Sequence, residues 1–418
     1  MYREGPRLHN ASRRALVVAS GRVREDPLTL IERACAQGRA AVLEEIARLI
    51  GELGDPAVDL YRHMLDYPLR PAKALRPTLC MSAARALGAT EEAVLTSAAT
   101  LELLHNAFLI HDDIEDESLL RRGRPTLQRS LGLSVAVNVA DGMFALGLRS
   151  LLLNTETIGL GPALDVLLTV GEMLQRTVEG QDIELGWISA NVVRFADDAF
   201  QQRYERMVEL KTAIYSFVTP VEVAAVAAGA PPRVRARLAD YGRHVGIAFQ
   251  ITDDLLNLGA DEALYGKESD GDLWEGKRTL ILLHALRHED DPAALSRARR
   301  VLALPRPRAA DAAPGGGALA ETLRELRAGG HLDAVAHERL TQALAAHPQG
   351  HAVKTDDDVA FLRALIQRRG SAEHAREVAL SHGRRAAEAL ADLRGSLAPG
   401  EALDFLQALP EHVVARLR

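Results

Sequence analysis

Apolar positions along this chain recur every three to four residues over long stretches, which is the spacing that places side chains on one face of an α-helix. Runs with the two-residue alternation of half-buried strands are scarce. The pattern predicts helices over residues 28–60, 73–87, 91–118, 132–154, 162–187, 198–229, 233–258 and 277–288, and again within 356–418. No fixed-period repeat indicates a solenoid. We therefore predict an all-α fold.

The pattern changes between residues 304 and 355, where Pro, Gly and Ala dominate. The segments PRPRAADAAPGGGALAE and HPQGHAVK interrupt the helical spacing with residues that break helices and form turns. We interpret this stretch as a surface insertion with one or two short helices, and not as a domain boundary. The prediction is a single domain over residues 1–418.

Composition supports the helical interpretation, because 47% of the residues are hydrophobic while only 4% are aromatic. Ala, Leu and Arg, which dominate, favour helices over strands. The formal net charge of -7 argues against a general nucleic-acid-binding protein, since such a protein needs a basic face to neutralise phosphates. Any recognition of phosphate must therefore be local.

The two cysteines, Cys35 and Cys80, are too few for a disulfide framework and show no spacing typical of zinc. The amino-terminal stretch ALVVAS is too short for a signal-peptide core. The longest apolar run, residues 93–111, is interrupted by polar side chains, so we expect no stable membrane insertion. These features predict a cytoplasmic protein.

Acidic residues follow two stretches that are apolar nearly all the way round a helix, AVLTSAATLELLHNAFLI and VGIAFQI. Helices of that kind are buried on most sides, so acids at their ends do not belong to an ordinary solvated face. On a helix, positions i and i+4 share a face, and carboxylates so placed suit Mg²⁺. The two acidic segments have the same spacing, Asp112, Asp113 and Asp116 in the first and Asp253, Asp254 and Asn257 in the second.

Spacing alone is a weak signal, because a chain with 57 acidic residues contains such a pattern by chance about once. Three other acidic clusters, at 197–198, 290–291 and 356–358, are predicted to be structural, the last as helix capping behind Thr355. What distinguishes the two acidic segments is the basic residues that follow them. A diphosphate held through metal ions needs cations on its remaining oxygens. These cations are Arg121 and Arg122 after the first segment, and Lys267 and Lys277 after the second.

Other candidates look ordinary when each is taken alone. Lys73 and Arg76, in RPAKALRPTL, are typical of a helix start, and His105 within an apolar run is typical of a core histidine. The pair Lys211 and Thr212, in ERMVELKTAIYSF, carries no signal by itself.

Taken together in chain order, these motifs resemble the trans-isoprenyl diphosphate synthases of the polyprenyl synthetase family. The similarity covers about residues 60–300 and 356–418, and it is carried by KALRP, the first acidic segment with its Arg-Arg-Gly, ELKTA, FQITDDLLN and GKESDGDLWEGKRT. The resemblance implies the class I terpenoid synthase fold, a single large helical bundle around a central cavity. It also implies a homodimer.

The resemblance assigns roles to individual residues. It implies that Asp112, Asp113, Asp116, Asp253 and Asp254 hold Mg²⁺, with three ions when substrate is bound. Arg121, Lys211, Thr212, Gln250 and Lys267 match positions around an allylic diphosphate, with Lys277 close by. Lys73, Arg76, His105 and Arg122 match the pocket for isopentenyl diphosphate. Two positions depart from the family pattern: Pro71-Ala72 replaces a glycine pair, and Asn257 stands where many members have aspartate.

The chemistry that follows is a 1′-4 head-to-tail condensation of isopentenyl diphosphate with an allylic diphosphate. Metal ions and cations stabilise the departing diphosphate, so no protein nucleophile is required. The growing chain must run along the helix that carries the first acidic segment, so Leu104, Ala107 and Phe108 should limit its length. Small Ala107 favours a tunnel deeper than a C15 product needs, and Phe108 opposes very long chains. We predict geranylgeranyl diphosphate, C20.

Three alternatives stay open. A farnesyl or longer-chain polyprenyl diphosphate synthase differs only in the depth of the tunnel. A non-catalytic regulatory subunit of a heteromeric synthase should lack the acidic segments, which are retained here. A terpene cyclase should lack the isopentenyl diphosphate residues Lys73, Arg76 and Arg122.

Overall fold

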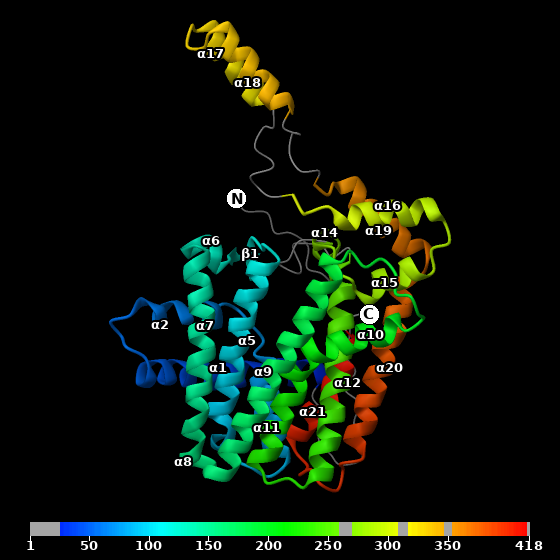
Figure 1. Ribbon diagram of the computed structural model, residues 1–418. Coiled ribbons are helices and arrows are strands. Elements are labelled where there is room, and N and C mark those ends of the chain that lie inside the picture. The colour runs from blue at the N-terminus through cyan, green and yellow to red at the C-terminus, as the bar shows by residue number, and fades with distance from the viewer. Residues whose placement is uncertain (1–25, 259–269, 308–316, 347–352, 416–418) are drawn as a thin grey trace, which may run out of the picture.

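The computed structural model describes residues 26–258, 270–307, 317–346 and 353–415. These residues form a bundle of helices with a single two-stranded hairpin among them, so the predicted all-α fold is confirmed (Figure 1). The amino-terminal elements are α1 (Pro27–Leu53), α2 (Asp59–Met64), α3 (Asp66–Leu69), α4 (Leu75–Ala86), α5 (Glu92–Glu115), β1 (Leu120–Arg121), β2 (Arg124–Pro125), α6 (Leu127–Leu131), α7 (Leu133–Ser150), η1 (Leu151–Leu153), α8 (Asn154–Ile158) and α9 (Leu160–Ser189).

The remaining elements complete the bundle around α12, which packs against η2, α20 and α21. They are α10 (Phe200–Val208), η2 (Glu209–Val218), α11 (Thr219–Ala227), α12 (Pro232–Asn257), α14 (Gly271–Glu275), α15 (Leu280–Arg287), α16 (Pro292–Ala303), α17 (Gly317–Ala328), α18 (Ala334–Ala346), α19 (Asp356–Arg368), α20 (Ser371–Ala391) and α21 (Glu401–Ala415).

Several predicted helix boundaries were wrong because the helical pattern continues across glycine breaks. The helix expected over 28–60 ends at Gly54, and the stretch 356–418 contains three helices separated near Gly370 and Gly400. Both of the latter glycines have positive φ, 62° and 151°, which other residues adopt only at a cost. Apolar spacing reports the buried face but not these interruptions.

The helix predicted over 198–229 consists of α10, the π-helical segment η2 and α11. The helices α9 and α12 approach η2 closely at positions occupied by glycine. A Cβ atom at Gly180 of α9 would lie 2.3 Å from the backbone nitrogen of Lys211, and a Cβ at Gly246 of α12 would lie 2.4 Å from the Cβ of Ala213. Because π-helical turns are rare and often occur at functional sites, η2 marks a region of interest.

The helices α5 and α12 carry the two acidic segments at their carboxyl-terminal ends. Both ends lie at the same end of the bundle, beside β1 and α14 (Figure 1). Most of α5 is buried, including Leu103, Ala107 and Ile110, as its nearly continuous apolar surface requires. The fold therefore brings two acidic helix ends to one place.

Two helices, α17 and α18, lie within the predicted insertion and stand away from the bundle (Figure 1). They pack against each other, and the residues on either side of the pair, 308–316 and 347–352, are outside the described ranges. The expected short helices are present, and the single-domain assignment stays a prediction.

By length and apolar composition, three described helical stretches could cross a membrane: Glu92–Glu115, Leu133–Ile158 and Phe200–Ala227. In the first and third, 72% of the most apolar window is buried inside the protein, but in the second only 44% is buried. The second stretch therefore presents an apolar surface outward.

Candidate active site

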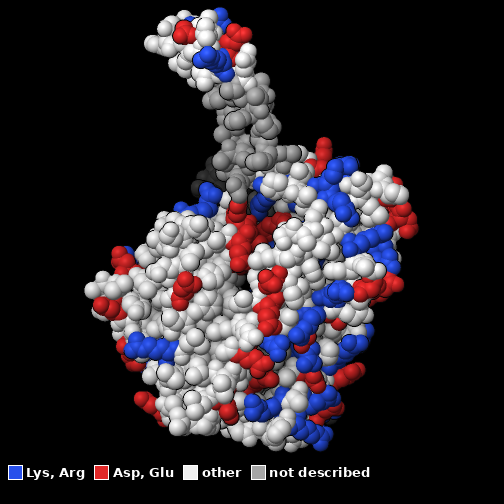
Figure 2. All heavy atoms as spheres, in the orientation of Figure 1, with Lys and Arg blue, Asp and Glu red and all other residues white. Residues whose placement is uncertain are grey.

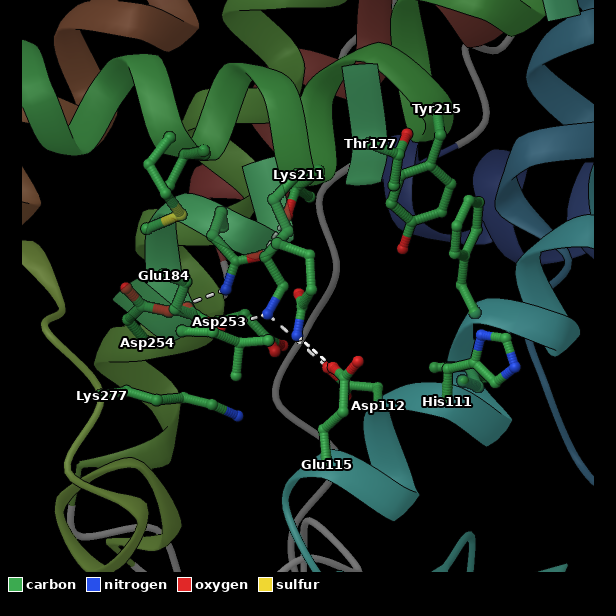
Figure 3. Close-up of a pocket in the computed structure, with 18 of the residues that line it drawn as sticks. His111, Asp112, Glu115, Thr177, Glu184, Lys211, Tyr215, Asp253, Asp254 and Lys277 are labelled. Atoms are coloured by element: carbon green, nitrogen blue, oxygen red, sulfur yellow. Dashed lines mark hydrogen bonds and ion pairs between the residues drawn. The ribbon is translucent and has the colours of Figure 1, made fainter. Parts of the chain in front are cut away.

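A cavity of about 540 Å³, here called the main cavity, lies among α5, α9, η2 and α12 (Figure 3). Acidic and basic groups from five parts of the chain face this one space, namely Asp112, Glu184, Lys211, Asp253 and Lys277. Acidic side chains also line a hollow on the face of the bundle in Figure 2. The aromatic and aliphatic part of the lining comprises Phe108, Leu109, Phe144, Val178, Leu185, Met207, Val208 and Phe249.

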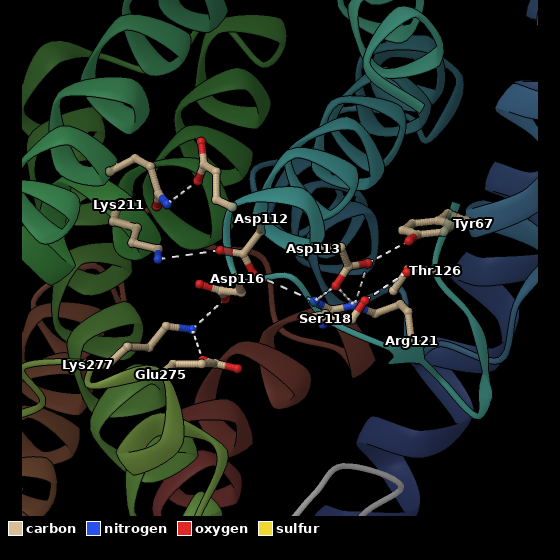
Figure 4. A network of polar contacts seen from close by, with 12 residues as sticks. Tyr67, Asp112, Asp113, Asp116, Ser118, Arg121, Thr126, Lys211, Glu275 and Lys277 are labelled. Atoms are coloured by element: carbon tan, nitrogen blue, oxygen red, sulfur yellow. Dashed lines mark hydrogen bonds and ion pairs between the residues drawn. The ribbon is translucent and has the colours of Figure 1, made fainter. Parts of the chain in front are cut away.

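Asp112 sits in the last turn of α5 and faces the main cavity between two cations (Figures 3 and 4). Its carboxylate oxygens are 3.6 Å from Arg121 Nη2 and 3.6 Å from Lys211 Nζ. These contacts leave the carboxylate at the cavity surface, where it could bind a cation together with a ligand.

Asp113 is placed differently from the prediction. It is fully buried, it does not line the main cavity, and both of its oxygens are bonded inside the protein. Tyr67 Oη donates to Oδ2 at 2.5 Å, and Arg121 Nε donates to Oδ1 at 2.9 Å (Figure 4). A buried, fully bonded carboxylate is a poor candidate for a metal ligand, so the geometry gives Asp113 the role of fixing Arg121.

Asp116 caps α5 and forms a buried ion pair with Lys277, whose Nζ is 2.7 Å from Oδ2. The same Nζ is 2.8 Å from Glu275 Oε2 (Figure 4). Burial raises the pKa of Asp116 to about 7, although Lys277 opposes the shift. Burial alone would lower the pKa of Lys277, but Asp116 and Glu275 outweigh it and hold that pKa well above its ordinary value. The predicted contact of Lys277 with this site is present.

The second acidic segment brings two carboxylates to the main cavity. Asp253 and Asp254 both line it. Asp254 is buried and accepts hydrogen bonds from Tyr204 Oη at 2.7 Å and Gln250 Nε2 at 2.8 Å. Burial raises the pKa of Asp254 to about 6, although these two donors oppose the shift. Asn257 Oδ1 accepts from the backbone N–H of Asp272 at 3.0 Å, so this side chain connects α12 to the start of α14.

Lys211 and Thr212 project from η2 into the main cavity. Lys211 pairs with Glu184 of α9 as well as approaching Asp112. Burial would lower the pKa of Lys211, but Glu184 and Asp112 raise it above its ordinary value, so the ammonium stays charged. Thr212 Oγ1 donates to Gln250 Oε1 at 2.9 Å. These contacts tie η2 to both α9 and α12.

A second hollow of about 200 Å³, here called the basic pocket, adjoins the main cavity and shares Arg76, His105 and Asp253 with it. Lys73 and Arg122 complete its basic lining. Arg76 is held by Tyr215 Oη at 3.0 Å and Ser216 Oγ at 3.1 Å, both in η2.

His105 contributes a neutral polar group to the basic pocket. Burial, together with Arg76 and Arg122, lowers the pKa of His105 well below its ordinary value. Its Nδ1 has no hydrogen-bond partner among the described residues. An orphaned polar atom beside three cations fits a pocket built for an anionic ligand. The ordinary interpretations of Lys73, Arg76 and His105 taken singly do not fit this arrangement.

The three residues proposed to limit chain length do not share one environment. Phe108 lines the main cavity and meets Phe144 of α7 edge to face, with ring centroids 5.0 Å apart. Leu104 and Ala107 are buried but do not line the main cavity. A Cβ at Gly147 would lie 2.8 Å from Leu104 Cδ2, so Leu104 packs against α7. Of the three residues, only Phe108 therefore lies on the wall of the main cavity. Phe144, which was not predicted, lies on that wall beside it.

Several residues that build this site are not predicted by any pattern in the sequence. Tyr67 and Tyr204 hold the buried aspartates, Glu184 pairs with Lys211, and Glu275 pairs with Lys277. Glutamates and tyrosines outside a spacing pattern give no signal in a single sequence. Lys267, also predicted at the site, lies outside the described residues.

The other three acidic clusters have structural roles and do not line the main cavity. Thr355 and Asp358 form a capping box at the start of α19, as predicted. Asp291 caps α16 by accepting from the backbone N–H of Ala293, and Asp197 pairs with Arg203.

The donor set suits a divalent metal ion that is shared with a ligand. Among the described residues, no three His, Cys, Asp or Glu side chains already form a closed metal site. Mg²⁺ is commonly held by one or two carboxylates together with substrate phosphates, so a closed protein cage is not needed. Asp112 and Asp253, from facing helices, fit that mode of binding.

Comparison with known proteins identifies the family. Residues 58–308 match the polyprenyl synthetase family model. The octaprenyl diphosphate synthase of Escherichia coli is 34% identical over 252 residues, which is 60% of this chain and 71% of the relative. A (2E,6E)-farnesyl diphosphate synthase of Mycobacterium tuberculosis is 35% identical over 223 residues, 52% of this chain and 57% of the relative.

The fold agrees with this assignment. The crystal structure of a geranylgeranyl pyrophosphate synthetase from Pyrococcus horikoshii matches with a TM-score of 0.70 and 25% identity, over 93% of this chain and 98% of that chain. The names of these relatives specify three different chain lengths, so they do not determine the product. The chain belongs to the polyprenyl synthetase family of trans-isoprenyl diphosphate synthases, which use divalent metal ions, and it is a prenyltransferase.

Proposed function

We propose that this enzyme makes geranylgeranyl diphosphate by Mg²⁺-dependent 1′-4 condensation of isopentenyl diphosphate with allylic diphosphates. The observation that carries the proposal is the pair of adjoining hollows. The main cavity has carboxylates and cations beside an apolar wall, and the basic pocket next to it offers three cations. Arg76, His105 and Asp253 belong to both, so two diphosphates would lie side by side.

The main cavity would receive the allylic substrate. Asp112 and Asp116 from α5, with Asp253 and Asp254 from α12, would hold up to three Mg²⁺ ions. When bound, the ions neutralise charge on the departing diphosphate. Further positive charge on its oxygens comes from Arg121, Lys211, Lys277 and, from outside the described residues, Lys267.

The basic pocket would receive isopentenyl diphosphate. Lys73, Arg76 and Arg122 supply three positive charges, and neutral His105 can donate a hydrogen bond without adding a fourth. The allylic C–O bond breaks to give a carbocation and free diphosphate, the alkene of isopentenyl diphosphate attacks that carbocation, and loss of a proton from the resulting cation forms a new double bond. The released diphosphate is the base that we propose for this proton, because it is an anion left next to the cation that must lose it.

The aromatic groups in the main cavity support the proposed C20 product. Phe108 contacts Phe144 and also lies 5.5 Å, centroid to centroid, from Tyr215. These rings lie beyond the acidic end of α5, where they would meet the growing chain. Farnesyl and longer-chain synthesis remain the alternatives, because the same architecture serves relatives with other products.

Product sizing tests the proposal. The purified chain should turn over dimethylallyl, geranyl and farnesyl diphosphates with isopentenyl diphosphate when Mg²⁺ is present, and should stop mainly at C20. Phe108→Ala removes the ring that faces the cavity and should lengthen the product. Ala107→Tyr should shorten it, although Ala107 is fully buried and a larger side chain there must first displace its neighbours.

The outcomes separate the alternatives. Activity that appears only with a second protein would support the regulatory-subunit hypothesis, and cyclic products without use of isopentenyl diphosphate would support a cyclase. A main product of C15, or one of C35 or longer, would overturn the C20 assignment. It would leave the proposed reaction intact. Unchanged product length in Phe108→Ala would remove Phe108 as the determinant.

We also propose that the enzyme is a homodimer that pairs through α7 and α9. A stripe of exposed apolar residues follows helical spacing on these two helices, and Figure 2 shows a broad surface with few charges in this region. Exposed apolar surfaces of this kind are typical of protein interfaces. The stripe consists of Leu133, Val137 and Leu148 on α7 and of Leu160, Leu164 and Leu168 on α9. Light scattering of the wild type and of Leu164→Lys with Leu168→Lys tests this, and a monomeric wild type would overturn it.

The cytoplasmic location and the lack of stable membrane insertion stay predictions.

A further inference from the structure

Arg70 is a buried arginine that lies just before the Lys73–Arg76 segment. Its side chain is only 2% exposed. Nε and Nη2 contact Asp66 Oδ1 at 2.8 and 2.6 Å, and the guanidinium lies 4.4 Å from the ring centroid of Tyr67. Burying a guanidinium costs several kcal/mol unless its donors are satisfied. The local structure is therefore organised around this side chain.

The remaining donors of Arg70 hold the β-hairpin that carries two of the site cations. Nη1 donates to the carbonyl of Arg121 at 2.9 Å, and Nη2 donates to the carbonyl of Pro125 at 2.8 Å. The hairpin has only two residues in each strand, and so short a hairpin is not stable by itself. Its shape depends on what fastens it to the bundle, and Arg70 fastens both strands.

The turn of this hairpin is strained, and Arg122 lies at its centre. Arg122 and Gly123 both have positive φ, 52° and 73°, as a two-residue hairpin turn of this class requires. Glycine adopts this conformation freely, whereas arginine does so at a cost of about 1 kcal/mol. The strained turn places the Arg122 side chain in the basic pocket. Such strain persists only where surrounding contacts hold it.

Arg121 and Arg122 differ in how else they are secured. Arg121 is bonded directly to Asp113, so its position does not rely on the hairpin alone. Arg122 has no carboxylate within salt-bridge distance among the described residues, and its side chain donates only to the carbonyl of Tyr67, at 3.2 Å. Loosening the hairpin should therefore move Arg122 more than Arg121.

The other side of the basic pocket begins at Arg70 itself. Arg39 of α1 donates to the carbonyl of Arg70 at 3.2 Å, which ties this backbone to the bundle. From there Pro71 and Ala72 lead to Lys73, and Pro71 restricts the backbone. Ala74 then adopts a left-handed conformation, with φ of 50°, before α4 begins. Arg70 thus joins the segment that carries Lys73 and Arg76 to the hairpin that carries Arg122.

We propose that Arg70 is a positioning residue that sets the Arg122 side of the basic pocket against the Lys73–Arg76 side, and so tunes the binding of isopentenyl diphosphate. The proposal rests on the proposed function of that pocket. Lysine cannot replace Arg70, because a single ammonium does not reach a carboxylate and two separate carbonyls in fixed directions. Arg70 does not touch the substrate and acts through the hairpin.

Kinetics with both substrates test this role. Arg70→Lys should raise the KM for isopentenyl diphosphate about 10-fold to 100-fold, as expected for displacement of a binding group by about 1 Å. The KM for the allylic substrate and kcat should stay within about 3-fold, because Arg121 keeps its bond to Asp113. Arg124→Lys is the matched control, since this exposed hairpin residue shares Asp66 but leaves the Arg70 contacts in place, and both KM values should be unchanged.

Binding measurements keep the test decisive whatever the kinetics show. Calorimetric titration of isopentenyl diphosphate into the folded proteins should show the same selective loss of affinity in Arg70→Lys and, if that variant fails to fold, in Asp66→Asn. Wild-type affinity for isopentenyl diphosphate in a folded Arg70→Lys protein, or an equal loss for both substrates, would overturn the positioning role. A wild type that binds isopentenyl diphosphate but never condenses it would instead overturn the proposed function.

Discussion

The two acidic segments have the same layout. In each, the first aspartate, Asp112 or Asp253, lines the main cavity. In each, the second aspartate, Asp113 or Asp254, is buried and accepts a hydrogen bond from a tyrosine hydroxyl. Two helices far apart in the chain thus arrive at one arrangement, in which a buried carboxylate holds the helix end and its neighbour stays available to a ligand.

The segments differ in the charge of the groups that donate hydrogen bonds to their buried aspartates. Asp113 is paired with the guanidinium of Arg121, whereas Asp254 accepts only from neutral donors, Tyr204 and Gln250. Asp254 also lines the main cavity, and Asp113 does not. The first segment therefore has its internal counter-charge in place, while the second keeps a buried carboxylate that a metal ion would neutralise. This difference predicts that equivalent substitutions in the two segments have unequal effects.

The largest effect is expected from the aspartates that line the cavity. Asp112→Asn should lower kcat/KM by about 1,000-fold, because it removes charge that would hold metal ions against the departing diphosphate. Asp253→Asn should cost at least about 100-fold by the same reasoning. Steady-state kinetics at saturating Mg²⁺ measure both.

The control for these variants is an aspartate that has a structural role at a helix start. Asp356 lies in the first turn of α19 and does not line the main cavity, so Asp356→Asn should leave kcat/KM within about 2-fold. Retention of more than a tenth of wild-type activity in Asp112→Asn would contradict the parallel between the segments.

A smaller effect, on stability, should distinguish the buried aspartates. Asp113→Asn leaves the guanidinium of Arg121, which is 14% exposed, without its charge partner and should lower the free energy of unfolding by about 3 kcal/mol. Asp254→Asn disturbs only neutral hydrogen bonds and removes a carboxylate that burial makes costly to ionise, so it should cost no more than about 1 kcal/mol. Urea denaturation of the metal-free proteins compares them, and equal losses would mean that the counter-charge is not what separates the segments.

Sequence spacing predicted the parts of this comparison that depend on helical periodicity. The apolar runs before Asp112 and Asp253 indicated buried helices, and the fold brings both acidic ends to one cavity. The sequence could not show which aspartate of each pair turns inward. That choice depends on Tyr67 and Tyr204, which come from distant helices and carry no pattern of their own.

The same limit explains the errors in the boundaries, and it explains why the sequence did not show that Leu104 and Ala107 lie in packed interior beside the cavity wall. A spacing of 3.6 residues continues across the α10–η2–α11 stretch, so it gives no sign of the π-helical turns or of the close approach of α9 and α12 at Gly180 and Gly246. Ala107 precedes Phe108 by one position, and a rotation of about 100° separates a cavity wall from the core. Periodicity fixes which face is buried but does not distinguish a wall of a cavity from packed interior.

A pH dependence should reveal which buried carboxylates are costly to ionise. Burial raises the pKa of Asp254 to about 6 and that of Asp116 to about 7 in the folded protein. A raised folded-state pKa stabilises the protein below the ordinary aspartate pKa of about 4, and that contribution is lost as the pH rises through the folded-state value. The two segments should therefore lose stability in neighbouring but distinct pH ranges.

Metal-free unfolding experiments in a chelating buffer can show this. Relative to Asp254→Asn, the wild type should gain about 1 to 2 kcal/mol of unfolding free energy when the pH falls from 8 to 5. The wild type should also gain unfolding free energy relative to Asp116→Asn as the pH falls. The midpoint of that gain should lie about one pH unit higher than for Asp254→Asn. A difference that does not change between pH 5 and pH 8 would show that these carboxylates already have adequate partners.

The smallest effect is expected at Asn257, the third position of the second segment. The corresponding residue of the first segment, Asp116, is paired with Lys277, whereas Asn257 lines the main cavity and is also bonded to the start of α14. Its Oδ1 accepts from the backbone of Asp272, and its carbonyl accepts from the backbone of Asp270 at 2.9 Å. Asn257→Asp keeps that acceptor and should change kcat/KM by less than about 3-fold, because this side chain has a structural role in connecting α12 to α14.

The alanine variant sharpens the same point. Asn257→Ala removes the acceptor and leaves the N–H of Asp272 without this partner, so it should cost about 1 kcal/mol of stability and a few-fold in activity. If the role of Asn257 is structural, the Asn257→Asp variant should have a higher kcat/KM and stability than Asn257→Ala, and both quantities should be close to those of the wild type. If Asn257→Asp instead tightened the apparent affinity for Mg²⁺ more than 10-fold, position 257 would be a ligand position that the asparagine leaves weak. The two segments would then be alike in all three positions, and the contact of Asn257 with α14 would be of secondary importance.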